Sequence, residues 1–76
     1  SSSSSRTVMK IQRNFRSGWP VEALIDFVET HPLCPAPSYE LCSNFPKILL
    51  ERSRNGRTPI GSLLGDTNVL LWVLQK

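Results

Sequence analysis

Few side chains in this sequence have the chemistry of a nucleophile, a general base or a zinc ligand. The one histidine, His31, lies close in sequence to Cys34, and Cys42 follows eight positions later. A cysteine beside a histidine can act as a nucleophile, and both residue types bind zinc. Three such residues cannot supply the four ligands of a structural zinc site, and a histidine at a helix end commonly interacts with the terminal carbonyls. We therefore predict no metal site, and we expect Cys34 and Cys42 to be free thiols.

Carboxylates and glycines also fail to form a catalytic or cofactor-binding pattern. Glu22, Asp26 and Glu29 share one face of a predicted helix, where such a ladder is usually solvated or paired with basic side chains. A phosphate-binding loop needs closely spaced glycines ahead of a helix. The glycines do not have that spacing: they are Gly18, Gly56, Gly61 and Gly65. We therefore predict no catalytic residue, no cofactor and no enzymatic activity.

The charged residues are segregated along the chain, which has a formal net charge of +3. Residues 1–17 carry only basic charges, and residues 18–45 carry only acidic ones. This pattern favours attraction between neighbouring segments, or faces that stay in contact with water. Phosphate binding by the first segment is the less favoured alternative, because aromatic side chains that could stack on bases do not alternate with its basic residues. Those basic residues are Arg6, Lys10, Arg13 and Arg16.

At 76 residues the chain has the length of one small domain. Ser1–Ser5 is a low-complexity polar stretch that we expect to be a flexible tail, so the predicted domain covers 6–76. No apolar signal segment follows the first basic residues, and the longest apolar run, Val69–Leu74, is too short to span a bilayer. These features predict an intracellular protein that does not enter a membrane.

Apolar spacing predicts helices in the first half of the chain. Intervals of three and four residues predict a helix over 6–17, through Val8, Ile11 and Phe15. Pro20 suits a first helical turn, and the apolar residues that follow it predict a second helix over 20–31. The prolines within 32–37 exclude regular structure there.

Further helices are predicted in the second half of the chain. An apolar cluster predicts a helix over 45–54, which Asn55–Gly56 ends. Thr58–Pro59 is a helix-start pair, and it predicts a helix over 58–65. The apolar block within 68–76 fits a helix or a buried strand, and we favour a helix because no other segment shows the pattern of a partner strand. The predicted fold is therefore all-α, a small domain of four to six short helices joined by tight turns.

The last third of the chain resembles one ankyrin repeat. Thr58–Pro59 followed by Ile60 matches the opening of the first helix of that repeat, and the apolar residues of 69–74 match its second helix. The segments Lys47–Glu51 and Val21–Glu29 are similar to the second helices of preceding repeats. The resemblance implies helix pairs that need neighbouring repeats to bury their apolar faces.

Together these features predict a non-enzymatic module that binds another protein or a neighbouring domain, as an adaptor or as a subunit of a complex. Its predicted binding face is the apolar side of the terminal helix, centred on Leu70, Leu71, Trp72 and Leu74. Arginines at the rim would steer an acidic partner, and these are Arg52, Arg54 and Arg57. The alternative is a basic subunit of a larger assembly that contacts nucleic acid through a helix over 6–16.

Overall fold

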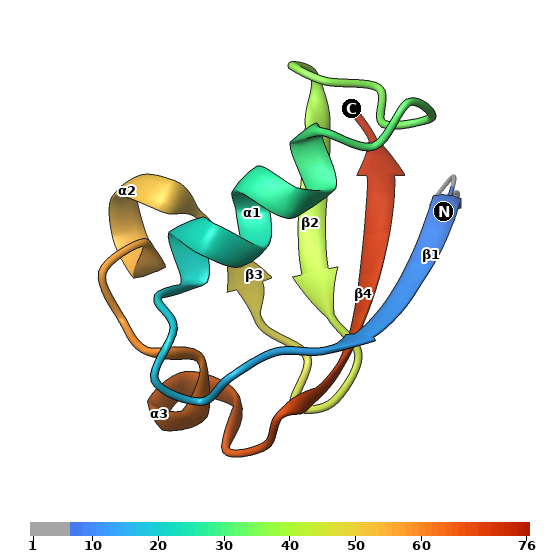
Figure 1. The fold of residues 1–76 in the computed structure, drawn as a ribbon. Coiled ribbons are helices and arrows are strands. Elements are labelled where there is room, and N and C mark those ends of the chain that lie inside the picture. The colour runs from blue at the N-terminus through green and yellow to red at the C-terminus, as the bar shows by residue number, and fades with distance from the viewer. Residues whose placement is uncertain (1–6) are drawn as a thin grey trace.

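A computed structural model describes residues 7–76 as an antiparallel sheet with a helix across one face (Figure 1). In chain order the elements are β1 (Thr7–Asn14), α1 (Val21–Glu29), β2 (Tyr39–Ser43), β3 (Leu49–Leu50), α2 (Arg52–Asn55), α3 (Ile60–Leu64) and β4 (Asn68–Gln75). The strand order across the sheet is β1-β4-β2-β3. Arg6 and Ser1–Ser5, the predicted flexible tail, lie outside the described residues.

The all-α prediction is wrong, and the terminal segment shows why. β4 lies between β1 and β2 and is antiparallel to both. Its side chains alternate between the two faces of the sheet, and both sets are apolar. A strand with apolar residues on both faces lacks the two-residue alternation of a half-exposed strand, so its sequence resembles that of a buried helix. The side chains that it buries under the helices are Val69, Leu71 and Val73.

The segment predicted as a helix over 6–17 forms the strand β1 instead. Ile11 pairs with Leu71 in the register of the two strands, and Met9 pairs with Val73, so alternate residues of β1 reach the core. The spacing of its apolar residues favours a helix locally, but the buried strand β4 needs hydrogen-bond partners along its length. That tertiary requirement outweighs the local pattern.

The helix predicted over 45–54 is replaced by a loop, a short strand and one helical turn. Leu50 pairs with Leu41 of β2, and both side chains lie in the core. Only Arg52–Asn55 is helical, and it ends at Gly56 as predicted. The helix pair implied by the resemblance to an ankyrin repeat does not form, because β4 occupies the place of its second helix.

Two predicted helices are confirmed, and both have strong local start signals. α1 lies within the predicted range 20–31 and begins after Pro20. α3 lies within 58–65, begins after Pro59 and ends at Gly65, whose φ of 76° is in the left-handed region that glycine adopts without strain. No helix in the described part of the chain is long and apolar enough to cross a membrane. The residues that α1 buries are Val21, Leu24, Ile25 and Val28.

The starts of these two helices hold each other in place. The Val21 N–H donates to the Thr58 carbonyl at 2.9 Å, and the Ile60 N–H donates to the Trp19 carbonyl at 2.7 Å. The first N–H groups of a helix have no partner within that helix, so the exchange between the two loops satisfies them. It also fixes α3 against the loop that leads into α1.

One apolar core lies between α1 and one face of the sheet. Phe15, after β1, and Phe27 of α1 meet edge to face with ring centroids 5.8 Å apart, which closes the core at the β1 side. Within residues 7–76, the opposite face of the sheet is not covered by a helix (Figure 1). The buried members of the core are Ile11, Phe15, Val21, Leu24, Ile25, Val28, Leu41, Leu50, Ile60, Val69, Leu71 and Val73.

Two neighbouring leucines test the strand assignment of the terminal segment. Leu71→Ala is expected to lower the free energy of unfolding by about 2–5 kcal/mol, because it leaves a cavity at a fully buried site. Leu70→Ala, on the opposite face, is expected to cost about 1 kcal/mol or less. Urea denaturation followed by circular dichroism measures both values. Equal losses at the two positions would contradict the alternation of β4.

Substitutions at two glycines test the close contact between α3 and the loop that leads into α1. Gly61 donates its N–H to the Ser17 carbonyl at 2.9 Å, and a Cβ at position 61 would overlap the Ser17 side chain. Gly61→Ala is therefore expected to destabilise the fold by about 1–3 kcal/mol, although alanine normally favours a helix. Gly18→Ala is the control, because nothing lies within 4 Å of the added atom. A thermal melt in which Gly61→Ala raises the melting temperature would refute this close approach.

Candidate functional site

The face of the sheet opposite the helices carries an apolar row on β4. Leu70, Trp72 and Leu74 alternate with the buried residues of this strand, so they lie on this face, where each is half-buried. Their neighbours follow from the strand register, in which Lys10 of β1 and Cys42 of β2 both pair with Trp72. We call this surface the outer face and define it by Lys10, Cys42, Leu70, Trp72 and Leu74.

Trp72 is the largest side chain of the outer face, and contacts on two sides fix its orientation. Its indole Nε1 donates a hydrogen bond to the Asn44 Oδ1 at 3.2 Å. The Lys10 Nζ lies 5.5 Å from the centroid of the indole ring, within the range of a cation–π interaction. The half-buried ring is therefore held in place before any partner arrives.

A hollow of about 320 Å³ lies beside Trp72 on the outer face. Its lining combines the apolar Trp72 and Leu74 side chains with the polar Asn44 and the basic Lys47. An apolar side chain of a partner would lose water there, and Lys47 offers a positive charge to a carboxylate next to it. The other lining residues are Thr7, Cys42 and Ser43.

The loop over 44–48 borders this hollow, and Ser43 holds the loop in shape. The Ser43 side chain is buried, its hydroxyl donates to the Pro46 carbonyl, and the same oxygen accepts from the Ile48 N–H at 3.2 Å. The Ser43 N–H also donates to the Ile48 carbonyl at 3.0 Å, and the Asn44 N–H donates to the Leu70 carbonyl at 2.9 Å. A buried hydroxyl that makes both bonds ties the loop to the end of β2.

Phe45 projects from the 44–48 loop with its side chain almost entirely in water. Its exposed fraction is 90%, the highest among the exposed large apolar residues of the described chain. Asn44 and Lys47, on either side of it in sequence, line the hollow, so the loop that carries Phe45 borders the outer face. The ring stabilises nothing inside the protein, and it would gain free energy by entering an apolar pocket of a partner.

The histidine and the cysteines do not form a reactive cluster. Burial, with the Glu40 carboxylate as a smaller contribution, raises the pKa of the Cys42 thiol. Reactive cysteines have the opposite shift, towards the thiolate. The Nδ1 of His31 accepts a hydrogen bond from the Leu33 N–H at 3.1 Å, which closes a turn after α1. Among residues 7–76, no group of histidine, cysteine and acidic side chains is arranged to hold a metal ion.

The structure separates the residues of the predicted binding face into three places. Leu70, Trp72 and Leu74 stand together on the outer face, whereas Leu71 is fully buried in the core. Arg52 and Arg54 of the predicted arginine rim lie elsewhere, because α2, which carries them, packs against α1 on the helical side of the sheet, and Arg57 follows in the connection to α3. The residues of that rim are Arg52, Arg54 and Arg57.

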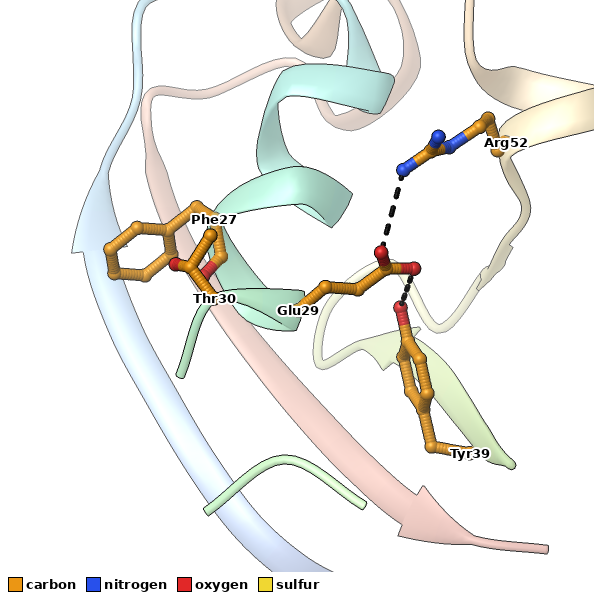
Figure 2. Close-up of polar contacts among 5 residues, drawn as sticks. All are labelled: Phe27, Glu29, Thr30, Tyr39 and Arg52. Atoms are coloured by element: carbon orange, nitrogen blue, oxygen red, sulfur yellow. Dashed lines mark hydrogen bonds and ion pairs between the residues drawn. The ribbon is translucent and has the colours of Figure 1, made fainter. Parts of the chain in front are cut away.

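Arg52 takes part in a small polar cluster centred on Glu29, at the end of α1 (Figure 2). The Glu29 Oε1 lies 3.6 Å from the Arg52 Nη2, and the Glu29 Oε2 accepts a hydrogen bond from the Tyr39 hydroxyl at 2.9 Å. Beside it, the Thr30 hydroxyl donates to the Phe27 carbonyl at 2.6 Å and satisfies a carbonyl of the last helical turn. The ion pair is partly exposed and contributes about 1 kcal/mol or less, so the cluster positions α1, β2 and α2 without fixing Arg52 strongly.

The residues that the sequence analysis missed are those of the 44–48 loop. The predicted helix over 45–54 covers Phe45 and Lys47 and leaves Asn44 outside, so it does not indicate an exposed ring. Pro46 is the signal that could have found them, because proline disfavours a helical conformation in the residue before it. A phenylalanine in a loop, unlike one in an amphipathic helix, has no apolar face to join.

Comparison of the chain with protein-family models, with curated proteins and with solved structures found no match. The relationship to ankyrin repeats is therefore neither supported nor contradicted by a relative. Any function assigned to the chain depends on the geometry of its own surface, above all on the outer face and Phe45.

The Glu29 cluster predicts how stability depends on pH. Burial, and then the hydrogen bond to Glu29 and the charge of that carboxylate, raise the pKa of the Tyr39 phenol above its ordinary value of 10.0. Above about pH 10 the unfolded chain releases this proton while the folded chain keeps it, so the free energy of unfolding should fall as the pH rises. Denaturant titrations over this range should show a smaller fall for Tyr39→Phe. Parallel pH profiles for the two proteins would contradict the assignment.

Proposed function

We propose that the chain is a non-enzymatic protein-binding module whose partner contacts Phe45 and the outer face around Trp72. The exposure of Phe45 is the observation that carries this proposal. Interfaces depend on a few large side chains, with aromatic residues over-represented, that enter desolvated pockets near their centre. Here one aromatic ring is free to enter a pocket of the partner, and a hollow beside Trp72 is ready to receive a side chain in return.

Rigid presentation of Phe45 favours tight binding. Association costs free energy when flexible side chains and loops become ordered at the interface. The hydrogen bonds of Ser43 already hold the 44–48 loop, and the contacts of Asn44 and Lys10 already hold the Trp72 ring. Less ordering is left for the moment of binding, so more of the apolar burial contributes to affinity.

The charges around this surface indicate the chemistry of the partner. Lys10 lies over Trp72 and Lys47 lines the hollow, so both basic side chains border apolar surface. A partner that places apolar side chains at the centre and carboxylates around them would match this arrangement. The arginine rim of Arg52, Arg54 and Arg57 stays a separate prediction that the outer-face contact does not use.

The proposed partner is a protein rather than a nucleic acid. The nucleic-acid alternative relied on a basic helix over 6–16, and that segment is the strand β1. Within β1 the Lys10 side chain lies over Trp72 on the outer face, whereas Arg13 lies over Phe27 on the helical side. Cations divided between two faces do not form one stripe along a phosphate backbone. The two free thiols, Cys34 and Cys42, support the intracellular location that we propose for the module.

Photo-crosslinking from position 45 tests whether this residue contacts a partner. The chain with Phe45→p-benzoylphenylalanine is expected to form a covalent adduct with one protein when irradiated in cell extract. The control carries the same label at Leu33, which is also exposed, at 68%, but lies in the loop between α1 and β2. Equal adducts at both positions, or none from position 45, would count against the proposal.

The purified partner then gives the energetic test. Phe45→Ser is expected to raise the Kd about 30-fold or more, as loss of an interface hot spot does, and to leave the melting temperature unchanged because the ring has almost no contact with the core. Leu33→Ser should keep the Kd of the unaltered chain. An unchanged Kd for Phe45→Ser, measured by calorimetry, would refute the proposed docking surface.

A further inference from the structure

The sheet has one long edge without a neighbouring strand. Within residues 7–76, β1 pairs only with β4, and it forms the margin of the sheet over eight residues (Figure 1). The other margin is β3, which has two residues and leads directly into α2. A long edge strand is a template on which an extended chain can form further backbone hydrogen bonds.

The backbone groups available at this edge follow from the alternation of an antiparallel ladder. The Phe15 N–H donates to the Thr67 carbonyl at 2.9 Å, so Phe15 and the residues of matching parity, including Ile11, direct their backbone groups towards β4. The residues between them direct their N–H and C=O groups away from β4, towards the open side. In the regular part of β1 these outward residues are Lys10, Gln12 and Asn14.

Basic side chains flank the edge on both faces of the sheet. The Lys10 ammonium lies over Trp72 on the outer face, and the Arg13 guanidinium lies 4.6 Å from the centroid of the Phe27 ring on the helical side. The one ion pair of the described residues joins Arg52 and Glu29, so neither cation of β1 has a carboxylate partner there. Both positive charges remain available to whatever pairs with the edge.

We propose that β1 binds an extended, carboxylate-bearing segment of another protein, which adds a strand to the sheet. Backbone hydrogen bonds to Lys10, Gln12 and Asn14 would hold the segment, and its carboxylates would meet Lys10 on one face and Arg13 on the other. Apolar side chains of the segment would meet the half-buried Met9 on the helical side. This site shares Lys10 with the outer face but is distinct from the Phe45 loop, which follows β2, so its backbone contacts are tested separately from the proposed contact of Phe45.

Charge excludes a second copy of this chain as the preferred occupant. Residues 7–17 contain Lys10, Arg13 and Arg16 and no acidic residue. If two β1 strands paired with each other, these cations would face cations across the new ladder, and like charges on paired strands are destabilising. A segment with two acidic residues three positions apart has the complementary pattern, because these side chains point to opposite faces of a strand.

A short acetylated peptide with two glutamates three positions apart, and valine at its other positions, is the probe for this edge, because residues three apart in a strand point to opposite faces. It is titrated into the 15N-labelled full chain, with amide shifts and amide hydrogen exchange as the readout. Binding is expected to shift the amides of Lys10, Gln12 and Asn14 and to slow their exchange, because each gains a backbone partner or becomes shielded from water. The same peptide with lysine in place of glutamate is expected to bind at least about tenfold more weakly.

Two variants at one position separate the backbone contribution from that of the side chain. Gln12→Pro removes an N–H that faces away from β4, at a position where an edge strand tolerates proline. It is expected to weaken peptide binding at least about tenfold while the thermal melt stays cooperative. Gln12→Thr keeps the N–H and is expected to retain the affinity of the unaltered chain.

Each other outcome would overturn the proposal. Peptide shifts confined to Trp72 and the 44–48 loop, or equal affinity for the glutamate and lysine peptides, would show that the edge is not the site. Absence of binding would show that Lys10 and the irregular start of β1 serve only to block strand addition. Concentration-dependent dimers with the same β1 amides protected would show that a second copy occupies the edge. If Gln12→Pro unfolds the chain, the unaltered chain is tested instead with a peptide that has proline at its centre. Because proline removes a backbone N–H from the peptide, unchanged affinity for it would refute the strand addition.

Discussion

The architecture depends on the need of one buried strand for hydrogen-bond partners on both sides. β4 carries apolar residues on both faces, and its backbone groups are satisfied by β1 along one side and β2 along the other. Once those two pairs form, alternation decides which side chains enter the core under α1. The same alternation places Trp72 on the face that no described helix covers. The core and the candidate binding surface are therefore two consequences of one strand.

The parts of the fold that could be predicted from the sequence are those with short-range signals. Pro20 and Thr58–Pro59 mark helix starts, and Gly65 marks a helix end, because each residue restricts or permits backbone angles by itself. The sheet has no such signal. The pairing of β1 with β4 joins residues about sixty positions apart, and the apolar spacing of each strand alone fits a helix. Only when β1 and β4 are considered together is it clear that each supplies the hydrogen-bonding strand that the other needs.

The candidate site was predictable in part, for the same reason. Leu70, Trp72 and Leu74, three of the four apolar residues of the predicted binding face, lie on the outer face. The segment is apolar throughout, so whichever of its faces is exposed carries apolar residues. Which of the four residues is buried depends on whether side chains repeat every two residues, as in a strand, or about every 3.6, as in a helix. The predicted helix therefore could not identify Leu71 as the buried one. The exposure of Phe45 is not predictable from the sequence, because it depends on the shape of the 44–48 loop. That shape is set by the hydrogen bonds of Ser43 and by the pairing of β2 with β3.

The central place of β4, which follows the other described strands in sequence, has a consequence for synthesis. β4 is the last of the described strands to leave the ribosome, yet β1 and β2 each need it as a neighbour. Until it emerges, β1 has no strand to pair with, and the apolar side of α1 has an incomplete sheet to cover. Contacts between residues far apart in sequence, such as those of β1 and β4, form slowly, because a long loop must close first. During translation the nascent chain would thus expose apolar surface until β4 emerges, and chaperones that bind such surface would find it there.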